Sequence, residues 1–206
     1  RRPPRSTQGV SSAASDVYKR QILGELLRRD PDGRLILIDD HEDGYWKRLL
    51  YERFKGVFPD VIDNVIFISR MSYTKFLGLL NLADAILDNP YLSGMNSGLE
   101  ALGIGAPIVA WPGKYCRGRW VAACYKQMGL SDLVATDEDS YLTLALRLAQ
   151  DIDFKRQMQT DIKAHSHKLY ERHEVIHEME NFFIAAYEAW QKGGVLKSFT
   201  CNESKR

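Results

Sequence analysis

The chain has 206 residues, of which 45% are hydrophobic and 27% charged, and its formal net charge is +1. The length and composition are typical of one globular domain, or of one domain and part of a second. The near-neutral charge gives no indication of a nucleic acid or an anionic membrane as partner. No apolar run approaches the roughly 18 residues of a membrane span and no signal-peptide core is visible, so we expect a cytoplasmic protein.

The first 21 residues, RRPPRSTQGVSSAASDVYKRQ, are rich in Arg, Pro and Ser and have almost no apolar periodicity. A targeting peptide is one interpretation. The second, which we favour, is a translated sequencing adapter, because SSAASDVYKRQ resembles such sequence. Residues 1–21 are therefore predicted to be a non-native or disordered leader.

The helical pattern after this leader starts abruptly, with an apolar stripe of Ile22, Leu23, Leu26 and Leu27. The run Leu35–Ile38 is then typical of a parallel strand that is buried on both faces. Because the pattern begins inside a helix, we expect the strand that should precede this helix to be missing.

The loop between residues 39 and 44, DDHEDG, offers His41 and several carboxylates to a metal ion. No second His is placed to help, and exposed acidic loops are common at strand ends. We therefore predict no metal site. The three cysteines, Cys116, Cys124 and Cys201, show no C-x-x-C spacing, so a disulfide framework and a zinc site are not indicated either.

Helices and strands alternate through the rest of the chain. The pattern predicts strands at Val65–Ile68, Asp84–Asp88, Pro107–Trp111 and Leu133–Ala135, and helices at Tyr45–Phe54, Tyr73–Leu82 (capped by Ser72), Arg117–Met128 and Ser140–Ala149. The fold class is therefore α/β, with an incomplete Rossmann-like, doubly wound parallel sheet over residues 22–150 that lacks its first strand. C-terminal helices occupy residues 151–192, at Phe154–Tyr170 and Val175–Trp190, and residues 193–206 form a flexible tail.

The stretch from Asp84 to Gly113 is the centre of this prediction. It contains a strand, a Gly/Ser/Asn loop, a short helix from Asn96 and a second strand. The two strands must run parallel, so the loop lies at the carboxyl edge of the sheet, where open α/β folds bind ligands.

A helix that opens with Asn96, Ser97 and Gly98 allows an anion, most plausibly a phosphate, to approach unpaired N–H groups and the positive end of the helix dipole. Glu100 lies on the same face one turn later, where its carboxylate suits a sugar diol. Simple helix capping is the alternative explanation for the Asn and Ser. Phe76, on the first turns of its helix, has an equally simple alternative as a core aromatic.

From Ile22 to about Trp190, the chain resembles the C-terminal, nucleotide-sugar-binding half of two-domain glycosyltransferases of the GT-B type. It is most similar to the O-linked N-acetylglucosamine transferase and SPINDLY-like family, especially its bacterial members. The matching segments are VIFISRMSYTKFLGLLNLADAILD, GMNSGLEALGIGAPIV and WPGKYCRGRWVAACYKQMGLSDLVA.

The resemblance implies a role for each residue of the donor site. Gly94, Asn96 and Ser97 would face the diphosphate, and Glu100 the ribose hydroxyls. Met71 would meet the base edge through its backbone and Phe76 would lie flat against the base. Arg119 would have a structural or phosphate-supporting role.

Three positions depart from the family pattern: Met95 replaces a frequent His, Tyr73 a Lys, and Lys114 an acid. These departures concern the identity of the donor and the direct help given to the leaving phosphate.

The implied reaction is transfer of a sugar, N-acetylglucosamine, from a nucleotide diphosphate sugar (a UDP-sugar) to a Ser or Thr hydroxyl of a protein, without a metal or other cofactor. No catalytic residue is assigned. We expect an N-terminal catalytic half, with tetratricopeptide repeats as one option, to be missing, and the fragment alone to be inactive. A nucleotide-sugar epimerase half and a non-catalytic nucleotide-binding or interaction module are the alternatives.

Overall fold

The computed structural model describes residues 5–8, 17–39, 44–195 and 198–199. The chain divides into two compact units, residues 1–167 and 168–206, and each is described by itself. The predicted absence of a metal at His41 lies outside the described residues. Among the residues that the structure does describe, no group of three or more His, Cys, Asp or Glu side chains is placed to hold a metal ion.

The first unit is built on a parallel sheet with the strand order β3-β2-β1-β4-β5. The strands are β1 (Arg5–Gln8), β2 (Gly33–Asp39), β3 (Val65–Ser69), β4 (Ala85–Leu87) and β5 (Ile108–Val109). Leu35 and Leu37 of β2 and all of β4 and β5 are buried, as expected for strands covered on both faces. The predicted α/β class and doubly wound parallel sheet are confirmed.

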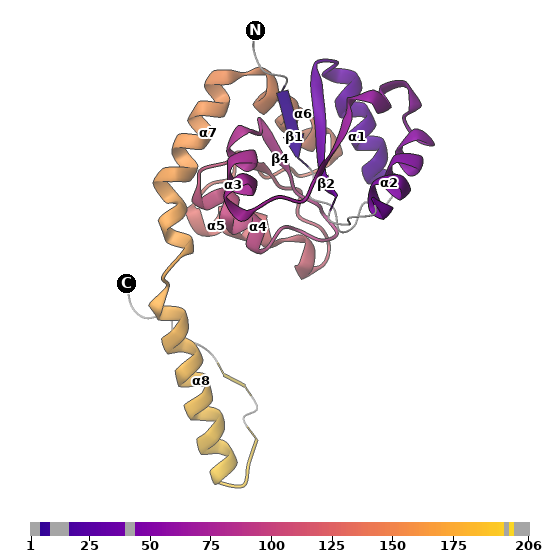
Figure 1. Cartoon of the computed structure of the whole chain (residues 1–206). Helices are drawn as coiled ribbons and strands as arrows, with labels where there is room; N and C mark the ends of the chain where they lie inside the picture. Colours follow the sequence, from indigo (N-terminus) through magenta and orange to yellow (C-terminus); the bar gives the residue numbers. More distant parts are fainter. Residues whose placement is uncertain (1–4, 9–16, 40–43, 196–197, 200–206) are drawn as a thin grey trace. The chain divides into compact units, whose positions relative to one another are not determined.

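Helices cover the sheet on both sides (Figure 1). Helices α1 (Val17–Arg29) and α2 (Tyr45–Lys55) lie on one side, and α3 (Tyr73–Leu82), α4 (Asn96–Gly103) and α5 (Trp120–Met128) on the other. Right-handed connections require this division, because the chain moves outward from β1 through β2 to β3 and then crosses back to β4 and β5.

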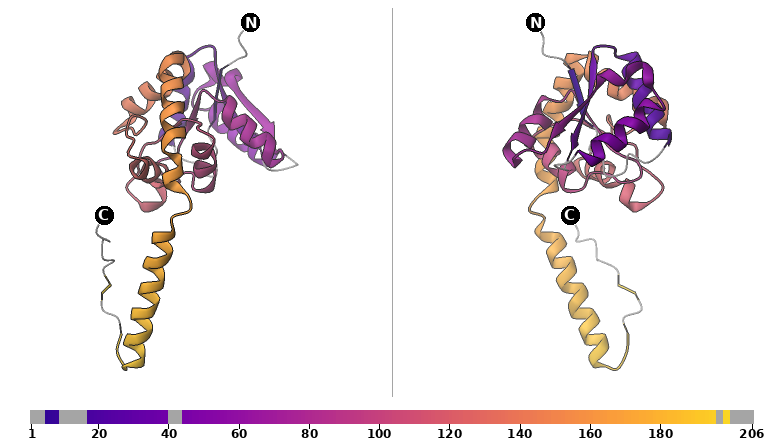
Figure 2. Two further views of the ribbon diagram at one scale, coloured as in Figure 1. Left: turned by 90° about the vertical axis from the view of Figure 1, so that its left-hand side faces the viewer. Right: turned by 45° about the vertical axis from the view of Figure 1, so that its right-hand side comes forward.

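Two further helices complete the unit. Helix α6 (Glu138–Gln150) begins at a capping box, in which the Asp137 carboxylate accepts the Ser140 N–H. It packs against α1 and β4, and α7 (Ile152–His165) packs beside α6 and α4 (Figure 2). The Lys155 Nζ atom lies 2.8 Å from Asp84 Oδ1 and ties α7 to the start of β4.

The core on the α1 side is closely packed. The Phe54 and Phe58 rings stack with centroids 5.2 Å apart, and both side chains are fully buried. A Cβ atom on Gly24 of α1 would lie 2.7 Å from Phe58 Cβ, so only glycine allows this approach.

The prediction that the sheet lacks its first strand is wrong in this structure. Strand β1 lies between β2 and β4, where Arg5–Gln8 pair with residues 33–36 and Thr7 and Gln8 pair with Ala85 and Ile86. Helix α1 likewise begins at Val17, inside the predicted leader of residues 1–21. The prediction considered only side-chain periodicity, whereas an open position between two strands is filled by backbone hydrogen bonds. The origin of residues 1–21 stays a prediction.

Three other elements differ clearly from the predictions, and the remaining boundaries differ by at most two residues. The strand expected at Leu133–Ala135 is a single parallel bridge between Ala110 and Val134. The helix expected from Arg117 begins at Trp120, after a 3-10 turn at Cys116–Gly118. The helix expected to reach Tyr170 ends at His165 and continues as a 3-10 turn, Ser166–Leu169. Ser72 does occupy the N-cap of α3, but its side chain makes no capping hydrogen bond.

The second unit contains α8 (His173–Gln191), which has no buried residue. The predicted flexible tail, residues 193–206, contacts this helix at Phe199, whose ring centroid lies 5.5 Å from that of Phe182. None of the helices in the described parts of the chain combines the length and apolar character that crossing a membrane requires.

Candidate functional site

Among the connections that leave the carboxyl edge of the sheet are residues 70–72 after β3, 88–95 after β4 and 110–119 after β5. Because all five strands are parallel, these connections emerge at the same edge, which is the ligand-binding edge of open α/β sheets.

The connection after β4 is held by a buried carboxylate. Asp88, with 6% of its surface exposed, accepts a hydrogen bond from Ser93 Oγ at 2.6 Å and another from the Gly94 N–H at 2.8 Å. Ser93 Oγ in turn accepts the Val121 N–H at 3.0 Å, in the first turn of α5. One carboxylate therefore determines where the chain enters α4 and, through Ser93, is linked to α5.

The connection after β5 is interlocked with this loop. The Ser93 N–H donates to the Arg117 carbonyl at 2.8 Å, and Arg117 Nε donates to the Tyr91 carbonyl at 3.1 Å. A Cβ atom on Gly113 or Gly118 would lie 1.8 or 1.9 Å from the Pro90 carbonyl oxygen. Both positions therefore require glycine, and the two loops form one unit, which we call the paired loops (residues 88–95 and 112–119).

Helix α4 begins beside the paired loops. Met95 is its N-cap, with φ −87° and ψ −82°, and makes no side-chain capping hydrogen bond. The first N–H groups of a helix have no partner within the helix and lie at the positive end of its dipole. They are therefore suited to an anion.

A cavity of about 270 Å³ lies at the start of α4. Its wall is largely apolar, and its polar part comes from the loop after β4 and the first turn of α4: Asp88, Asn89, Ser93, Gly94 and Ser97. The structure thus brings two of the predicted diphosphate residues, Gly94 and Ser97, to one cavity.

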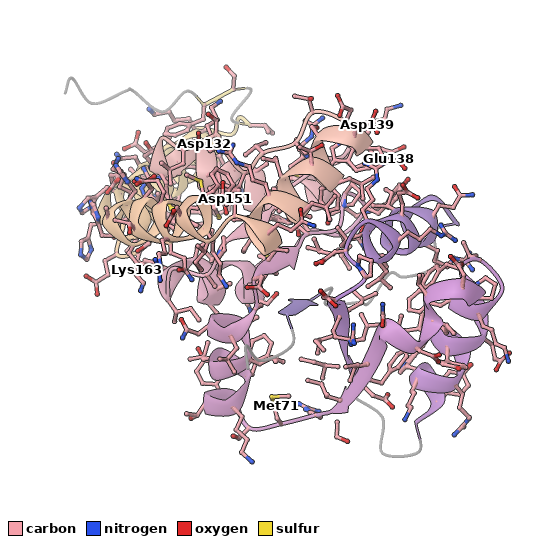
Figure 3. All side chains as sticks on the ribbon, turned by 90° about the horizontal axis from the view of Figure 1, so that it is seen from above. Met71, Asp132, Glu138, Asp139, Asp151 and Lys163 are labelled. Carbon is pink, nitrogen blue, oxygen red and sulfur yellow. The ribbon has the colours of Figure 1, made fainter. Side chains whose placement is uncertain are left out.

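The other predicted residues lie outside the lining of this cavity. Asn96 is exposed as the first residue of α4, and Glu100 is half-buried one turn later. Met71 lies on the connection from β3 to α3, on the side of the unit opposite Glu138 and Asp139 of α6 (Figure 3). Phe76 is half-buried, so it keeps the exposed surface that stacking on a base requires.

Arg119 has a structural partner. Its Nε donates to the Gly113 carbonyl at 2.5 Å and holds the turn that follows Pro112. This contact supports the structural part of the predicted role, and the phosphate-supporting part stays a prediction.

The sequence analysis missed the residues that support the site. Tyr141 of α6, which is buried, donates from its hydroxyl to the Asp88 carbonyl at 2.8 Å. Burial, followed by the nearby Asp88 charge, raises the pKa of Tyr141 well above its ordinary value. The position of Asp88 at the end of a buried strand could have marked it as a candidate residue in the sequence. Nothing in the sequence links it to Tyr141 or Val121.

The comparison with protein families gives a match over the site. The model of glycosyl transferase family 41 matches residues 60–179, a range that contains all seven predicted site residues. Two UDP-N-acetylglucosamine–peptide N-acetylglucosaminyltransferases are similar in sequence. The enzyme of Caenorhabditis elegans is 27% identical over 123 residues, covering 59% of this chain and 11% of that enzyme. The enzyme of Giardia intestinalis is 25% identical over 151 residues, which cover 71% of this chain and 10% of that enzyme.

Solved structures show the same fold. The O-GlcNAc transferase of Thermobaculum terrenum superposes with a TM-score of 0.70 at 22% identity, covering 82% of this chain and 33% of that chain. The sucrose-phosphate synthase of Thermosynechococcus elongatus superposes with a TM-score of 0.62 at 14% identity, covering 90% of this chain and 46% of that chain. The UDP-GlcNAc 2-epimerase of Neisseria meningitidis superposes with a TM-score of 0.52 at 15% identity, covering 81% of this chain and 43% of that chain. The chain thus spans about a tenth of the length of the two similar enzymes.

Proposed function

Because this chain belongs to glycosyl transferase family 41, we propose that it is the donor-binding part of an enzyme that transfers N-acetylglucosamine from a UDP-sugar to a Ser or Thr hydroxyl of a protein. The observation that carries the proposal is the family match over residues 60–179, which spans the whole candidate site. The names of the two similar enzymes, which describe transfer of N-acetylglucosamine from its UDP derivative to a peptide, support this choice of donor and acceptor.

The chemistry of the site agrees with this role. Departure of the nucleotide leaves negative charge on the diphosphate, and fixed N–H donors at a helix N-terminus stabilise such charge. The start of α4, with Gly94 and Ser97 at the cavity, supplies these donors. Glu100 would hold the ribose, and the backbone of Met71 and the ring of Phe76 would hold the base.

We further propose that the chain alone binds nucleotide without transferring sugar. Transfer also needs groups that bind the acceptor hydroxyl and take its proton, and no residue of this chain is assigned to that step. In our proposal those groups come from a catalytic half that corresponds to parts of the related enzymes that this chain does not span. Tetratricopeptide repeats are proposed as a further segment of that half.

Titration calorimetry of the full 206-residue chain with UDP and UDP-N-acetylglucosamine tests the proposal. We expect both to bind, and no glycosylated peptide to form when a Ser- and Thr-containing acceptor is added. Absence of UDP binding contradicts the donor-binding role. Sugar transfer by the isolated chain contradicts the proposal that the catalytic groups come from another part of the enzyme.

The same incubation separates the epimerase alternative. An epimerase releases or interconverts the sugar without an acceptor, so free sugar or an epimer in the products would replace our proposal with that activity.

A further inference from the structure

Asp88 is a buried acid beside a site that is proposed to bind a diphosphate. Its two carboxylate oxygens accept hydrogen bonds from Ser93 Oγ and the Gly94 N–H, and the residue is 6% exposed. It also lines the cavity at the start of α4, together with Gly94 and Ser97.

Charge alone makes this placement unfavourable for the ligand. A carboxylate and a phosphate repel each other, and the repulsion is strong in a partly buried site. A residue that merely lined the cavity would therefore weaken the binding of an anion. The hydrogen bonds indicate a different contribution.

The bonds of Asp88 determine the path of the backbone into α4. Gly94 immediately precedes the N-cap Met95, so a fixed Gly94 N–H fixes where the helix begins. Ser93 Oγ, which donates to Asp88, accepts the Val121 N–H of α5 at the same time. The carboxylate therefore connects the loop after β4 to the loop after β5 and to the helix that follows it.

We propose that Asp88 is a positioning residue for the diphosphate, acting through Ser93 and Gly94 to hold the first N–H groups of α4 in the arrangement that binds it. This inference rests on the proposed donor-binding function. Pre-arranged donors bind a charge without a cost of reorganisation, so loss of the arrangement weakens binding of the diphosphate but leaves contacts to the nucleoside unchanged.

The test compares UDP with uridine on the full chain, using the wild type and Asp88→Asn. The variant keeps the size of the side chain and removes its charge. We expect the affinity for UDP to fall about tenfold, the effect of losing one charge-assisted hydrogen bond, while the affinity for uridine stays the same. If Asp88 acted through its charge alone, the variant would bind UDP more tightly, and this result would overturn the proposal.

Hydrogen exchange of the unliganded chain provides a second measurement that does not depend on any ligand. We expect the amides of residues 94–98 to exchange about tenfold faster in Asp88→Asn than in the wild type. Unchanged exchange at these amides contradicts the inference. A wild-type chain that binds no UDP contradicts the proposed function instead, and the exchange result still decides whether Asp88 holds the loop.

Two further variants separate positioning from general stability. Ser93→Ala removes the bridge between Asp88 and Val121 and should reproduce the selective loss of UDP affinity, including when Asp88→Asn fails to fold. Phe54→Leu is the control: its ring is fully buried against Phe58 in the core on the α1 side, and it does not line the cavity at the start of α4. It should lower the melting temperature without changing the ratio of UDP affinity to uridine affinity. A selective fall in UDP affinity in this control as well would overturn the proposal.

Discussion

The two halves of the candidate site are built differently. The phosphate half, the paired loops with the start of α4, is held by side-chain hydrogen bonds that reach as far as Tyr141, 53 residues from Asp88. The base half, residues 70–76, is held in the described structure by backbone bonds from Arg70 to Asp39 and from Phe76 to Ser72, and its Tyr73 is 60% exposed.

This difference agrees with what each half is proposed to bind. A diphosphate needs several donors at fixed positions, and donors fixed in advance cost nothing to reorganise. A base needs a flat side chain, which binds by contact over a surface and tolerates small movements. We therefore expect the phosphate half to be sensitive to small structural changes and the base half to be tolerant.

The largest effect is expected from replacing a glycine of the paired loops by alanine. Gly118→Ala places a Cβ atom 1.9 Å from the Pro90 carbonyl oxygen, so the paired loops must separate. We expect a loss of stability of at least about 3 kcal/mol and loss of UDP binding, measured by urea unfolding and calorimetry.

Gly78→Ala is the matched control next to the base half. It lies in α3, and a Cβ atom there meets nothing within 4 Å. The gain in helix propensity should raise stability by up to about 1 kcal/mol and leave UDP affinity unchanged. Equal losses in the two variants would show that the halves do not differ in rigidity.

The next largest effect is expected at Glu100. Loss of two hydrogen bonds from ribose hydroxyls in Glu100→Ala should cost roughly 3 kcal/mol, or about a hundredfold in UDP affinity. Because the carboxylate is only half-buried, we expect the fold to tolerate its removal and the melting temperature to change little. Calorimetry that finds wild-type affinity would remove Glu100 from the site.

A smaller effect is expected from Phe76→Ala in the base half. Stacking on a base contributes about 1 to 3 kcal/mol, so UDP affinity should fall by about tenfold while affinity for inorganic pyrophosphate stays constant. The variant should fold, because Phe76 is half-buried. An unfolded variant would support the alternative that Phe76 is a core residue.

The smallest effect is expected from Tyr141→Phe, which leaves the Asp88 carbonyl without this donor and should cost about 1 kcal/mol. The pKa of Tyr141 is raised in the folded state, so the folded state favours the protonated hydroxyl. Its contribution is present below the ordinary pKa of 10.0 and is lost as the pH rises above it. The free energy of unfolding of the wild type should thus fall faster than that of the variant above pH 10. Parallel plots of stability against pH would show that the ionisation of Tyr141 does not cause the loss.

Local pattern determined most of the architecture and the edge of the sheet at which the candidate site lies. The apolar run Leu35–Ile38 and the alternation after it predicted the parallel sheet, because strands covered on both faces need apolar side chains throughout. Parallel strands joined through helices have their carboxyl ends at one edge, so the order of elements alone placed Met71, Gly94 and Glu100 near that edge.

The tertiary structure decided what local pattern does not encode. Residues Arg5–Gln8 have no apolar alternation, and they form the central strand through backbone bonds to β2 and β4. The contact of Ser93 with Val121 and the approach of Pro90 to Gly118 join residues that are distant along the chain. Such contacts depend on how the loops are brought together by the folded sheet, and no periodicity within one segment carries that information.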